Sequence, residues 1–398
     1  MLIDSTLREG AQAYGVYFGR GNRRRVAELL ALAGVDEIEC GWLGQQTQGE
    51  PLTEFLDWAR GALPQACGTA GSPGGPALSL WSPCREADVR EAAELARCGF
   101  IQRLSIGAPS SAAHRQKRLG LSLGEMVSRV RTVVGTARAE GIGYISVGLE
   151  DVSRAEPGEA LELARAAVDA GASRIRLSDT VGVLTPLSTA ALVSRFVQAL
   201  PVAVAFHGHN DLGMATANAV TALMSGASFV DATALGLGER AGIAVLEEVA
   251  AWLTLRSGTG ACYDLTALRG LCRVASMAAR VPVARNKAVA GEDVFSAESG
   301  IHVHGIQRDP ALFEPFAPEA VGATRHLGVG AKSGQAALGA AVKRLLSARP
   351  ACETPGPGTE GPGAGGAGTV DPGMMDRVRA LAWRLGRPLT DSEILTVI

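Results

Sequence analysis

The chain lacks the features that would set it apart from ordinary globular proteins. Its seven cysteines are scattered and odd in number, and no C-x-x-C pair occurs, which argues against a disulfide framework and a structural zinc site. No apolar run approaches membrane-spanning length, and Met1 opens the sequence without a basic leader. We therefore expect a cytoplasmic protein with no membrane partner.

Strong charge of either sign is also missing. The formal net charge is -2 and the pI is near 6.3, so no sustained basic field favours a nucleic acid or an anionic membrane as partner. The one basic cluster, at residues 23–25, is expected to be the solvated start of a helix, and the alternative is a docking point for phosphate groups. With 398 residues and 47% hydrophobic residues, the chain can bury one large core and a smaller appendage.

What the sequence does contain is a regular alternation of short apolar runs with longer amphipathic segments, up to about residue 256. About eight such units in about 250 residues predict a closed (β/α)8 TIM barrel. An open doubly wound sheet is the alternative, but no glycine-rich phosphate loop follows the first strand. The expected strands are 2–3, 37–40, 77–81, 101–106, 144–147, 174–177, 202–206 and 229–232, and the clearest helices are 23–33, 87–98, 123–139 and 158–170.

Composition changes after the barrel and suggests four domains or segments. Helical patterns at 265–280 and 335–347 flank a stretch rich in Gly and His, whereas residues 350–373 have almost no large apolar side chains. The domains that we expect are a barrel (1–258), a mainly helical accessory region (259–349), a Pro/Gly-rich linker (350–373) and a short helical unit (374–398).

Polar residues that directly follow barrel strands are the first candidates for chemistry, because active sites of this fold lie at the carboxyl ends of the strands. Three clusters stand out, at residues 4–12, 207–211 and 236–240. Side chains two apart on an extended segment point the same way, so His207 and His209 can face one point. Closure of the barrel makes strand eight the neighbour of strand one, so that Glu9 can add an oxygen ligand for a divalent metal.

Four motifs together resemble the isopropylmalate, citramalate and homocitrate synthase family. The similarity covers about residues 1–345, and the opening Arg-Glu pair with the short tail is most like homocitrate synthases, especially those associated with nitrogenase cofactor assembly. The motifs are LREGAQ at 7–12, HGHNDLG at 207–213, GLGERAG at 236–242 and ESGIH at 298–302.

The resemblance implies an enzyme that condenses acetyl-CoA with a 2-oxo acid on one divalent ion, which is Mn, Mg, Zn or Co. Glu9, His207 and His209 would be the metal ligands. Arg8 would stabilise the developing alkoxide, and its alternative role is a salt bridge that closes the barrel.

Further roles follow from the same resemblance. Gln12 and Thr180 would bind the substrate carboxylate, although Thr180 could instead cap a helix. His302 would be the base that deprotonates the thioester methyl group. Glu150 would orient that base or a water molecule.

Some positions depart from the family pattern. Ile243 stands where many relatives have asparagine, and Phe313 stands where they often have tyrosine. No clear arginine is available for a second carboxylate of the substrate, and Arg85 is a candidate by position alone.

Alternatives stay open at this point. 2-Oxoglutarate is the expected oxo acid, whereas citramalate, isopropylmalate and phosphonomethylmalate synthases would share the metal and the base. An acyl-CoA lyase or aldolase and a non-catalytic relative are further alternatives. The accessory region is too small to close a site alone, so we expect a homodimer that takes His302 from a neighbouring subunit.

Overall fold

The computed structural model describes residues 1–44, 49–64, 74–347 and 372–397. Two compact units make up the chain. The barrel unit comprises Met1–Ala284 with Ala288–Ala290, and the carboxyl-terminal unit comprises Arg285–Lys287 with Gly291–Ile398.

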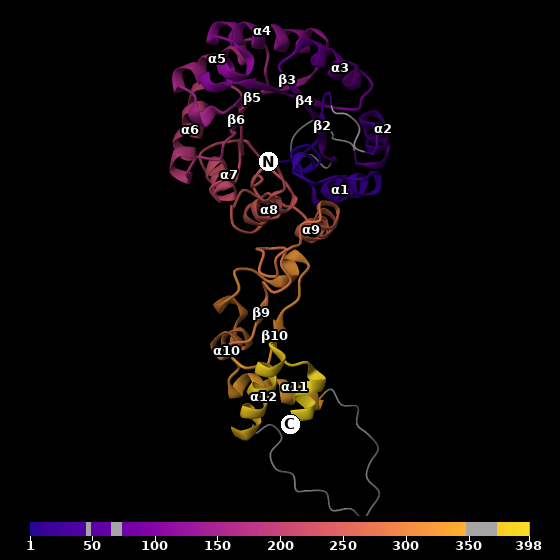
Figure 1. Cartoon of the computed structure of the whole chain (residues 1–398), viewed down its shortest axis with the longest axis vertical. Coiled ribbons are helices and arrows are strands. Elements are labelled where there is room, and N and C mark those ends of the chain that lie inside the picture. The colour runs from indigo at the N-terminus through magenta and orange to yellow at the C-terminus, as the bar shows by residue number, and fades with distance from the viewer. Residues whose placement is uncertain (45–48, 65–73, 348–371, 398) are drawn as a thin grey trace, which may run out of the picture. The chain divides into compact units, whose positions relative to one another are not determined.

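Eight parallel strands in the described part of the chain close into a barrel (Figure 1). The ring closes because β1 pairs with β8 as well as with β2. The strands are short and almost entirely buried, as expected for a parallel sheet that is covered on both faces. The predicted TIM barrel is therefore confirmed. The strands are β1 (Leu2–Asp4), β2 (Glu37–Trp42), β3 (Ala77–Pro83), β4 (Arg103–Pro109), β5 (Tyr144–Glu150), β6 (Arg174–Asp179), β7 (Ala203–Gly208) and β8 (Phe229–Ala232).

Helices cover the outside of the ring, and polar residues fix where several of them begin. Ser122 and Thr185 form capping boxes at the starts of α4 and α6, which satisfies backbone N–H groups that have no partner within the helix. Asp264 caps α9, which packs against α1. The helices are α1 (Arg20–Ala33), α2 (Leu52–Ala62), α3 (Glu86–Arg97), α4 (Leu123–Ala139), α5 (Pro157–Asp169), α6 (Pro186–Ala199), α7 (Ala215–Met224), α8 (Leu246–Leu255) and α9 (Leu265–Ala279).

Two charged layers lie inside the barrel. Glu37 and Glu39 are two residues apart on β2, so both carboxylates point inward at different heights. Arg174 donates to both oxygens of Glu37, at 2.7 and 3.0 Å, and Arg103 donates to one of them at 2.7 Å. Arg176 donates to Glu39 at 2.7 Å. Each buried charge therefore has a close partner of opposite sign, as burial requires.

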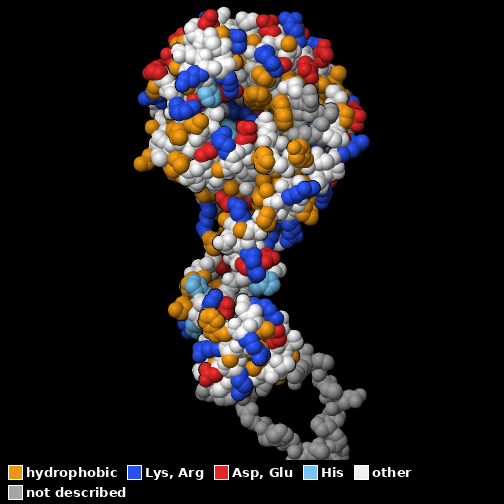
Figure 2. All heavy atoms as spheres, viewed as in Figure 1, with side chains coloured by type: hydrophobic (Ala, Val, Ile, Leu, Met, Phe, Trp, Pro, Cys, Tyr) orange, Lys and Arg blue, Asp and Glu red, His pale blue; other side chains and the backbone are white. Residues whose placement is uncertain are grey.

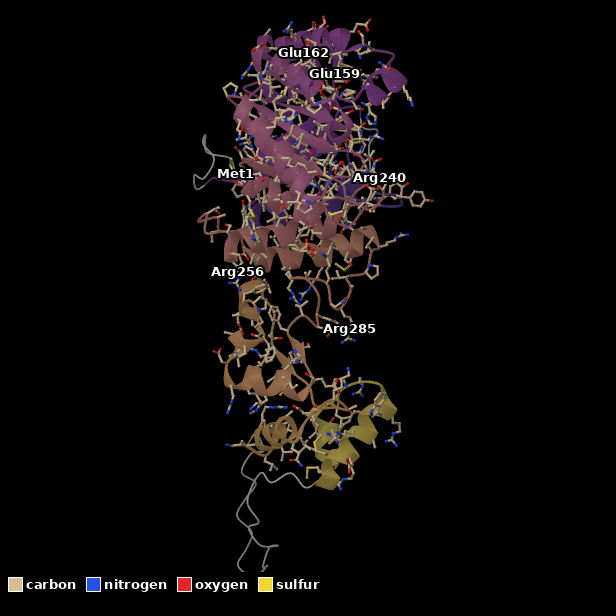
Figure 3. The ribbon with its side chains drawn as sticks, turned by 90° about the vertical axis from the view of Figure 1, so that its left-hand side faces the viewer. Met1, Glu159, Glu162, Arg240, Arg256 and Arg285 are labelled. Carbon is tan, nitrogen blue, oxygen red and sulfur yellow. The ribbon has the colours of Figure 1, made fainter. Side chains whose placement is uncertain are left out.

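The two faces of the barrel differ in what they carry. Figure 3 views this unit from the side, with Met1 on one face and Arg240 on the other. Arg240 belongs to the loop that follows β8, so its face is the one formed by the carboxyl ends of the strands. Across the described residues, no helix is both long and apolar enough to span a membrane.

The arginine cluster at residues 23–25 is only partly the solvated helix start that we expected, because Arg25 is exposed on α1 whereas Arg23 is not. Helix α1 already begins at Arg20, and Arg23 is buried within its first turns. Its guanidinium donates to the Cys40 carbonyl at 2.8 Å and lies 4.1 Å from the centre of the Phe55 ring. Arg23 therefore holds α1 against β2 and α2.

The carboxyl-terminal unit is mainly helical, as predicted for the region after the barrel. Its core brings α11, α12 and α13 together around Leu338 and Val378, which are fully buried. A bridge between Val329 and Leu389 ties the tail to the middle of the unit. The linker predicted at 350–373 lies outside the described residues, apart from two residues that begin α12. The elements are β9 (Ser296–Ala297), α10 (Gly300–Arg308), β10 (His326–Leu327), α11 (Gln335–Ser347), α12 (Pro372–Leu385) and α13 (Asp391–Val397).

Candidate active site

The loop after β1 is held tightly at the carboxyl-terminal face of the barrel. Thr6 donates to the Asp4 side chain from both its backbone and its hydroxyl group, at 2.9 and 2.8 Å. The same hydroxyl accepts from the backbone N–H of Ala234, beyond β8, at 2.9 Å. This link fixes the position of Glu9, three residues later, relative to the end of β8.

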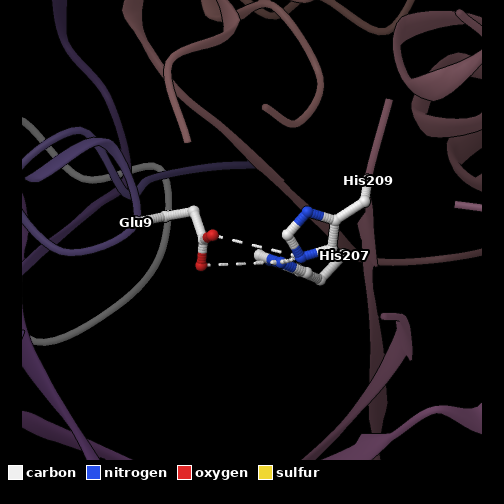
Figure 4. A group of neighbouring side chains, drawn as sticks. All are labelled: Glu9, His207 and His209. Atoms are coloured by element: carbon white, nitrogen blue, oxygen red, sulfur yellow. Dashed lines mark hydrogen bonds and ion pairs between the residues drawn. The ribbon is translucent and has the colours of Figure 1, made fainter. Parts of the chain in front are cut away.

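Glu9, His207 and His209 converge at one point, as predicted (Figure 4). The Nε2 atoms of the two imidazoles are 3.4 Å apart. The carboxylate oxygens of Glu9 lie 3.9 Å from Nε2 of His207 and 4.0 Å from Nε2 of His209. Ligand atoms that each lie about 2.1 Å from a shared ion have separations of this order.

The protonation states also suit a metal. His207 Nδ1 lies 2.8 Å from the Asp231 carboxylate, which accepts the Nδ1 proton and leaves Nε2 directed at Glu9 and His209. Burial, followed by the nearby His207, lowers the pKa of His209 to about 3. Burial raises the pKa of Glu9, but Arg8 and the two imidazoles outweigh it and lower the pKa overall. Glu9 and His209 are therefore in the deprotonated form that a metal binds.

Glu9 adds a further sign of fit. Its Oε1 atom is buried and makes no hydrogen bond within the described residues. A buried carboxylate oxygen without a donor is costly, and a cation at this position would satisfy it. Two imidazoles and one carboxylate suit a divalent transition ion with open coordination positions.

Arg8 lies between Glu9, His207 and His209, which we call the metal group, and the charged layer of the barrel that contains Glu39. It forms an ion pair with Glu9, and its Nε atom donates to Glu39 at 2.9 Å. Burial lowers the pKa of Arg8, but the Glu39 and Glu9 charges outweigh it and raise the pKa overall. Arg8 therefore does pair with a barrel-wall carboxylate, and it also lines the cavity in front of the metal group.

A cavity of about 190 Å³ opens above these residues. Figure 2 shows the barrel face hollowed near its centre, with basic and histidine side chains gathered there. The cavity has room for a small acid but not for a whole coenzyme A. Its walls comprise Arg8, Glu9, Gln12, Trp81, Ser105, Ile106, Gly107, Arg118, Gly148, Glu150, Arg176, Ser178, Thr180, His207, His209 and Glu239.

Gln12 and Thr180 both line this cavity, as does Glu150. The hydroxyl oxygen of Thr180 accepts from the backbone N–H of Asp151 at 2.8 Å, so its hydrogen stays available to a ligand. The helix after this loop is capped by Thr185, not by Thr180. Helix capping is therefore not the role of Thr180.

Arg118 is a charged wall residue that the sequence analysis did not single out. It ends a π-helical segment after β4, Ala113–Arg118, and forms an ion pair with Glu150. Its one available signal was its place soon after a barrel strand.

Arg85 does not face the cavity. It lies outside the set of wall residues and lines a separate hollow of about 520 Å³ with Cys84 and Arg129. Its guanidinium is paired with Asp88, one turn further along, at 2.6 Å. The suggestion that Arg85 binds a second carboxylate is therefore wrong, because its side chain is paired with Asp88 on α3 and does not line the cavity.

Ile243 lies directly beside a metal-group residue. It pairs with His209 in an isolated antiparallel bridge, which sets the two side chains next to each other on one face. Ile243 is fully buried, and His209 Nδ1 has no hydrogen-bond partner within the described residues. The apolar side chain thus leaves this imidazole without the acceptor that an amide would offer.

His302 belongs to the carboxyl-terminal unit, on α10. Its Nδ1 atom lies 2.6 Å from the Ser299 hydroxyl, and its ring centre lies 4.4 Å from that of Phe313. A Cβ on Gly305 would come within 2.3 Å of Phe313, so glycine gives this ring its space. The imidazole is therefore oriented locally by a hydroxyl group and an aromatic face.

Comparisons with known proteins agree with this architecture. Residues 1–275 match the HMGL-like family model, and residues 289–348 match the model described as "Homocitrate synthase post-HMGL domain-like". The crystal structure of the Bacillus subtilis HMG-CoA lyase has a TM-score of 0.59 and 20% identity, with 72% of this chain and 96% of that one covered, and shows the same fold.

The relatives found by sequence comparison carry the names of related synthases. A homocitrate synthase of Frankia alni is 39% identical over 84% of this chain and 90% of its own length. A 2-isopropylmalate synthase of Caldanaerobacter subterraneus is 36% identical over 85% and 83%, respectively. A 2-phosphonomethylmalate synthase of Streptomyces rubellomurinus is 31% identical over 100% and 97%. With a family model over most of its length and such relatives, the chain belongs to the HMGL-like family, among its homocitrate synthase-like acyltransferases.

Proposed function

We propose that the protein condenses acetyl-CoA with 2-oxoglutarate to give homocitrate and free CoA. The convergence of Glu9, His207 and His209 beside Arg8, in a chain 39% identical to a homocitrate synthase, carries this proposal. In the reaction, the acetyl methyl carbon loses a proton and bonds to the keto carbon of the oxo acid. Water then cleaves the thioester and releases the thiol.

Glu9, His207 and His209 would hold one divalent ion, which when bound supplies Lewis-acid polarisation of the keto group. Arg8 adds a permanent positive charge inside the cavity, where it stabilises the negative charge that develops on the keto oxygen. Gln12 and Thr180 orient the carboxylate next to the keto group. Thr180 suits this role because its hydroxyl hydrogen is free to donate.

His302 is our candidate for the base that removes the methyl proton. When its Nδ1 proton is donated to the Ser299 oxygen, Nε2 keeps the lone pair that a base needs. Glu150 lines the cavity and would orient the base or the hydrolytic water. We also propose that residues 1–258 form the catalytic domain and that residues 259–349 complete the active site. The active form would be a homodimer. The protein would be cytoplasmic and would take part in the assembly of the nitrogenase cofactor.

The test is free-thiol release from acetyl-CoA with a panel of 2-oxo acids, before and after treatment with a metal chelator. We expect 2-oxoglutarate to give the highest kcat/KM, and the chelator to abolish activity until Mn²⁺ or another divalent ion is restored. No thiol release with any oxo acid would refute the synthase, whereas cleavage of a condensed thioester would favour a lyase.

2-Phosphonomethylmalate synthase is the second candidate, because the relative with that activity matches over the whole chain. Its oxo acid, 3-phosphonopyruvate, carries a phosphonate on C3, whereas 2-oxoglutarate carries its distal carboxylate on C4. Thiol release that is faster with 3-phosphonopyruvate than with 2-oxoglutarate would select this alternative.

A further inference from the structure

The cavity has a polar wall opposite the metal group. In a closed barrel of eight strands, β4 lies four strands from β8 and therefore across the barrel from it. Ser105 and Gly107 are two apart on β4 and point to the same side, and both line the cavity. An oxo acid that is held at the metal group by its keto end would extend its other end toward this wall.

Space at the wall is kept open by glycine. A Cβ on Gly107 would come within 2.5 Å of both Oε1 of Glu150 and the Trp81 ring. The missing side chain thus leaves room over β4 for both the Trp81 ring and the Glu150 carboxylate. The Arg118 guanidinium sits on the same carboxylate, at the end of this row.

Two polar groups at the wall have hydrogen-bonding capacity to spare. Ser105 is 2% exposed, and its hydroxyl has no partner within the described residues. Arg118 contacts Glu150 through Nη2, and across the described part of the chain its Nε and Nη1 atoms have no further partner. A buried hydroxyl without a partner is costly unless a ligand completes it.

We propose that Ser105 and Arg118 form the subsite for a second anionic group at the far end of the oxo acid, and that Arg118 determines substrate class. This inference rests on the proposed synthase function and deepens it. The Arg118 fork would bridge Glu150 and the substrate, because a guanidinium can serve two anions through separate edges. Without Arg118, Glu150 would repel an anionic tail.

The chemistry of the wall selects between substrate classes. A carboxylate or a phosphonate satisfies both the hydroxyl and the guanidinium, whereas a branched apolar tail leaves both without partners and is disfavoured. Carboxylate and phosphonate tails share this recognition. Their relative rates decide which of the two is the natural substrate.

The experiment compares kcat/KM for 2-oxoglutarate, 3-phosphonopyruvate, pyruvate and 2-oxoisovalerate in the wild type and three variants. Arg118→Gln should lower kcat/KM for the two doubly anionic acids by about 30-fold and Ser105→Ala by about 10-fold, as lost hydrogen bonds to a charged group predict. Values for pyruvate should change less than about threefold. Arg85→Gln is the matched control, because Arg85 is also half-exposed and paired with a carboxylate but lies outside the cavity.

Binding of each oxo acid to the Mn²⁺-loaded protein, measured by calorimetry, separates this inference from the proposed function. Selective loss of 2-oxoglutarate binding in Arg118→Gln, in a wild type that releases no thiol, would support the subsite and refute the synthase. An active wild type that prefers pyruvate or 2-oxoisovalerate would refute the subsite and the choice of 2-oxoglutarate, whereas the condensing activity would stand. Equal losses for all acids in Arg118→Gln, or the same loss in Arg85→Gln, would also overturn it. A wild type that binds no oxo acid refutes both.

Discussion

Replacing Asp231 tests how a buried carboxylate prepares His207 for the metal. Asp231 is fully buried and lies 2.8 Å from His207 Nδ1, so it fixes the orientation of the ring and places the proton on Nδ1. Asp231→Asn keeps an oxygen acceptor and loses the charge, whereas Asp231→Ala loses both. Loss of such a partner lowers metal affinity by about 10- to 100-fold. We expect about 10-fold for Asp231→Asn and about 100-fold for Asp231→Ala, or about 1.4 and 2.7 kcal/mol.

The assay is titration of metal-free protein with Mn²⁺, with free Mn²⁺ followed by electron paramagnetic resonance. Asp264→Asn is the control, because it makes the same chemical change at the cap of α9 and contacts no imidazole. Thermal melting of each metal-free variant verifies folding, since Arg176 keeps its ion pair with Glu39 when Asp231 is changed. A folded Asp231→Ala protein that binds Mn²⁺ as tightly as the wild type would refute the reasoning.

Three further predictions follow. His302→Ala should leave metal and oxo-acid binding unchanged in calorimetry while slowing thiol release at least roughly 100-fold. His207→Ala should instead abolish metal binding and oxo-acid binding. The reverse pattern would contradict the proposed roles of the two histidines. Burial raises the pKa of Glu37, but the surrounding arginines outweigh it and lower it to about 2. The ionised Glu37 carboxylate therefore stabilises the folded state fully above the unfolded pKa of about 4.3, and this stabilisation is lost as pH falls toward 2. The free energy of unfolding measured in urea should thus depend on pH less steeply in Glu37→Gln than in the wild type. Equal pH dependence in the two proteins would contradict this. Gly107→Ala places a Cβ 2.5 Å from the Trp81 ring. It should raise KM for the oxo acid about tenfold without abolishing metal binding, because the displaced side chains reduce the space in the cavity. An unchanged KM would contradict a role of Gly107 in substrate binding.

The order of the barrel elements could be predicted because apolar alternation is a local property of the sequence. The ends of the strands could not. The strand expected at 144–147 extends to Glu150, because Gly148 and Glu150 stay in the sheet through pairing with β4 and β6. The extension was missed because neither residue carries an apolar side chain. Such pairing depends on neighbours that are distant in the sequence.

The metal group could also be predicted, because barrel closure brings the ends of β1, β7 and β8 together regardless of loop detail. The cavity wall could not. Arg85 and Arg118 both follow strands, and which of them faces inward depends on the π-helical turn after β4 and on the ion pair with Glu150. Asp231 was missed because an acidic residue within an apolar strand gives no sign of its imidazole partner.

The two charged layers inside the barrel offer different prospects for protein engineering. Glu39 touches Arg8, so redesign at that height would alter the reaction centre. Glu37, Arg103 and Arg174 pair among themselves, two residues deeper along β2. Exchanging a whole buried ionic cluster for well-packed aliphatic side chains is often neutral or stabilising. Glu37, Arg103 and Arg174 are therefore the residues to replace when higher thermal stability is sought, because Arg8 and its contacts stay unchanged.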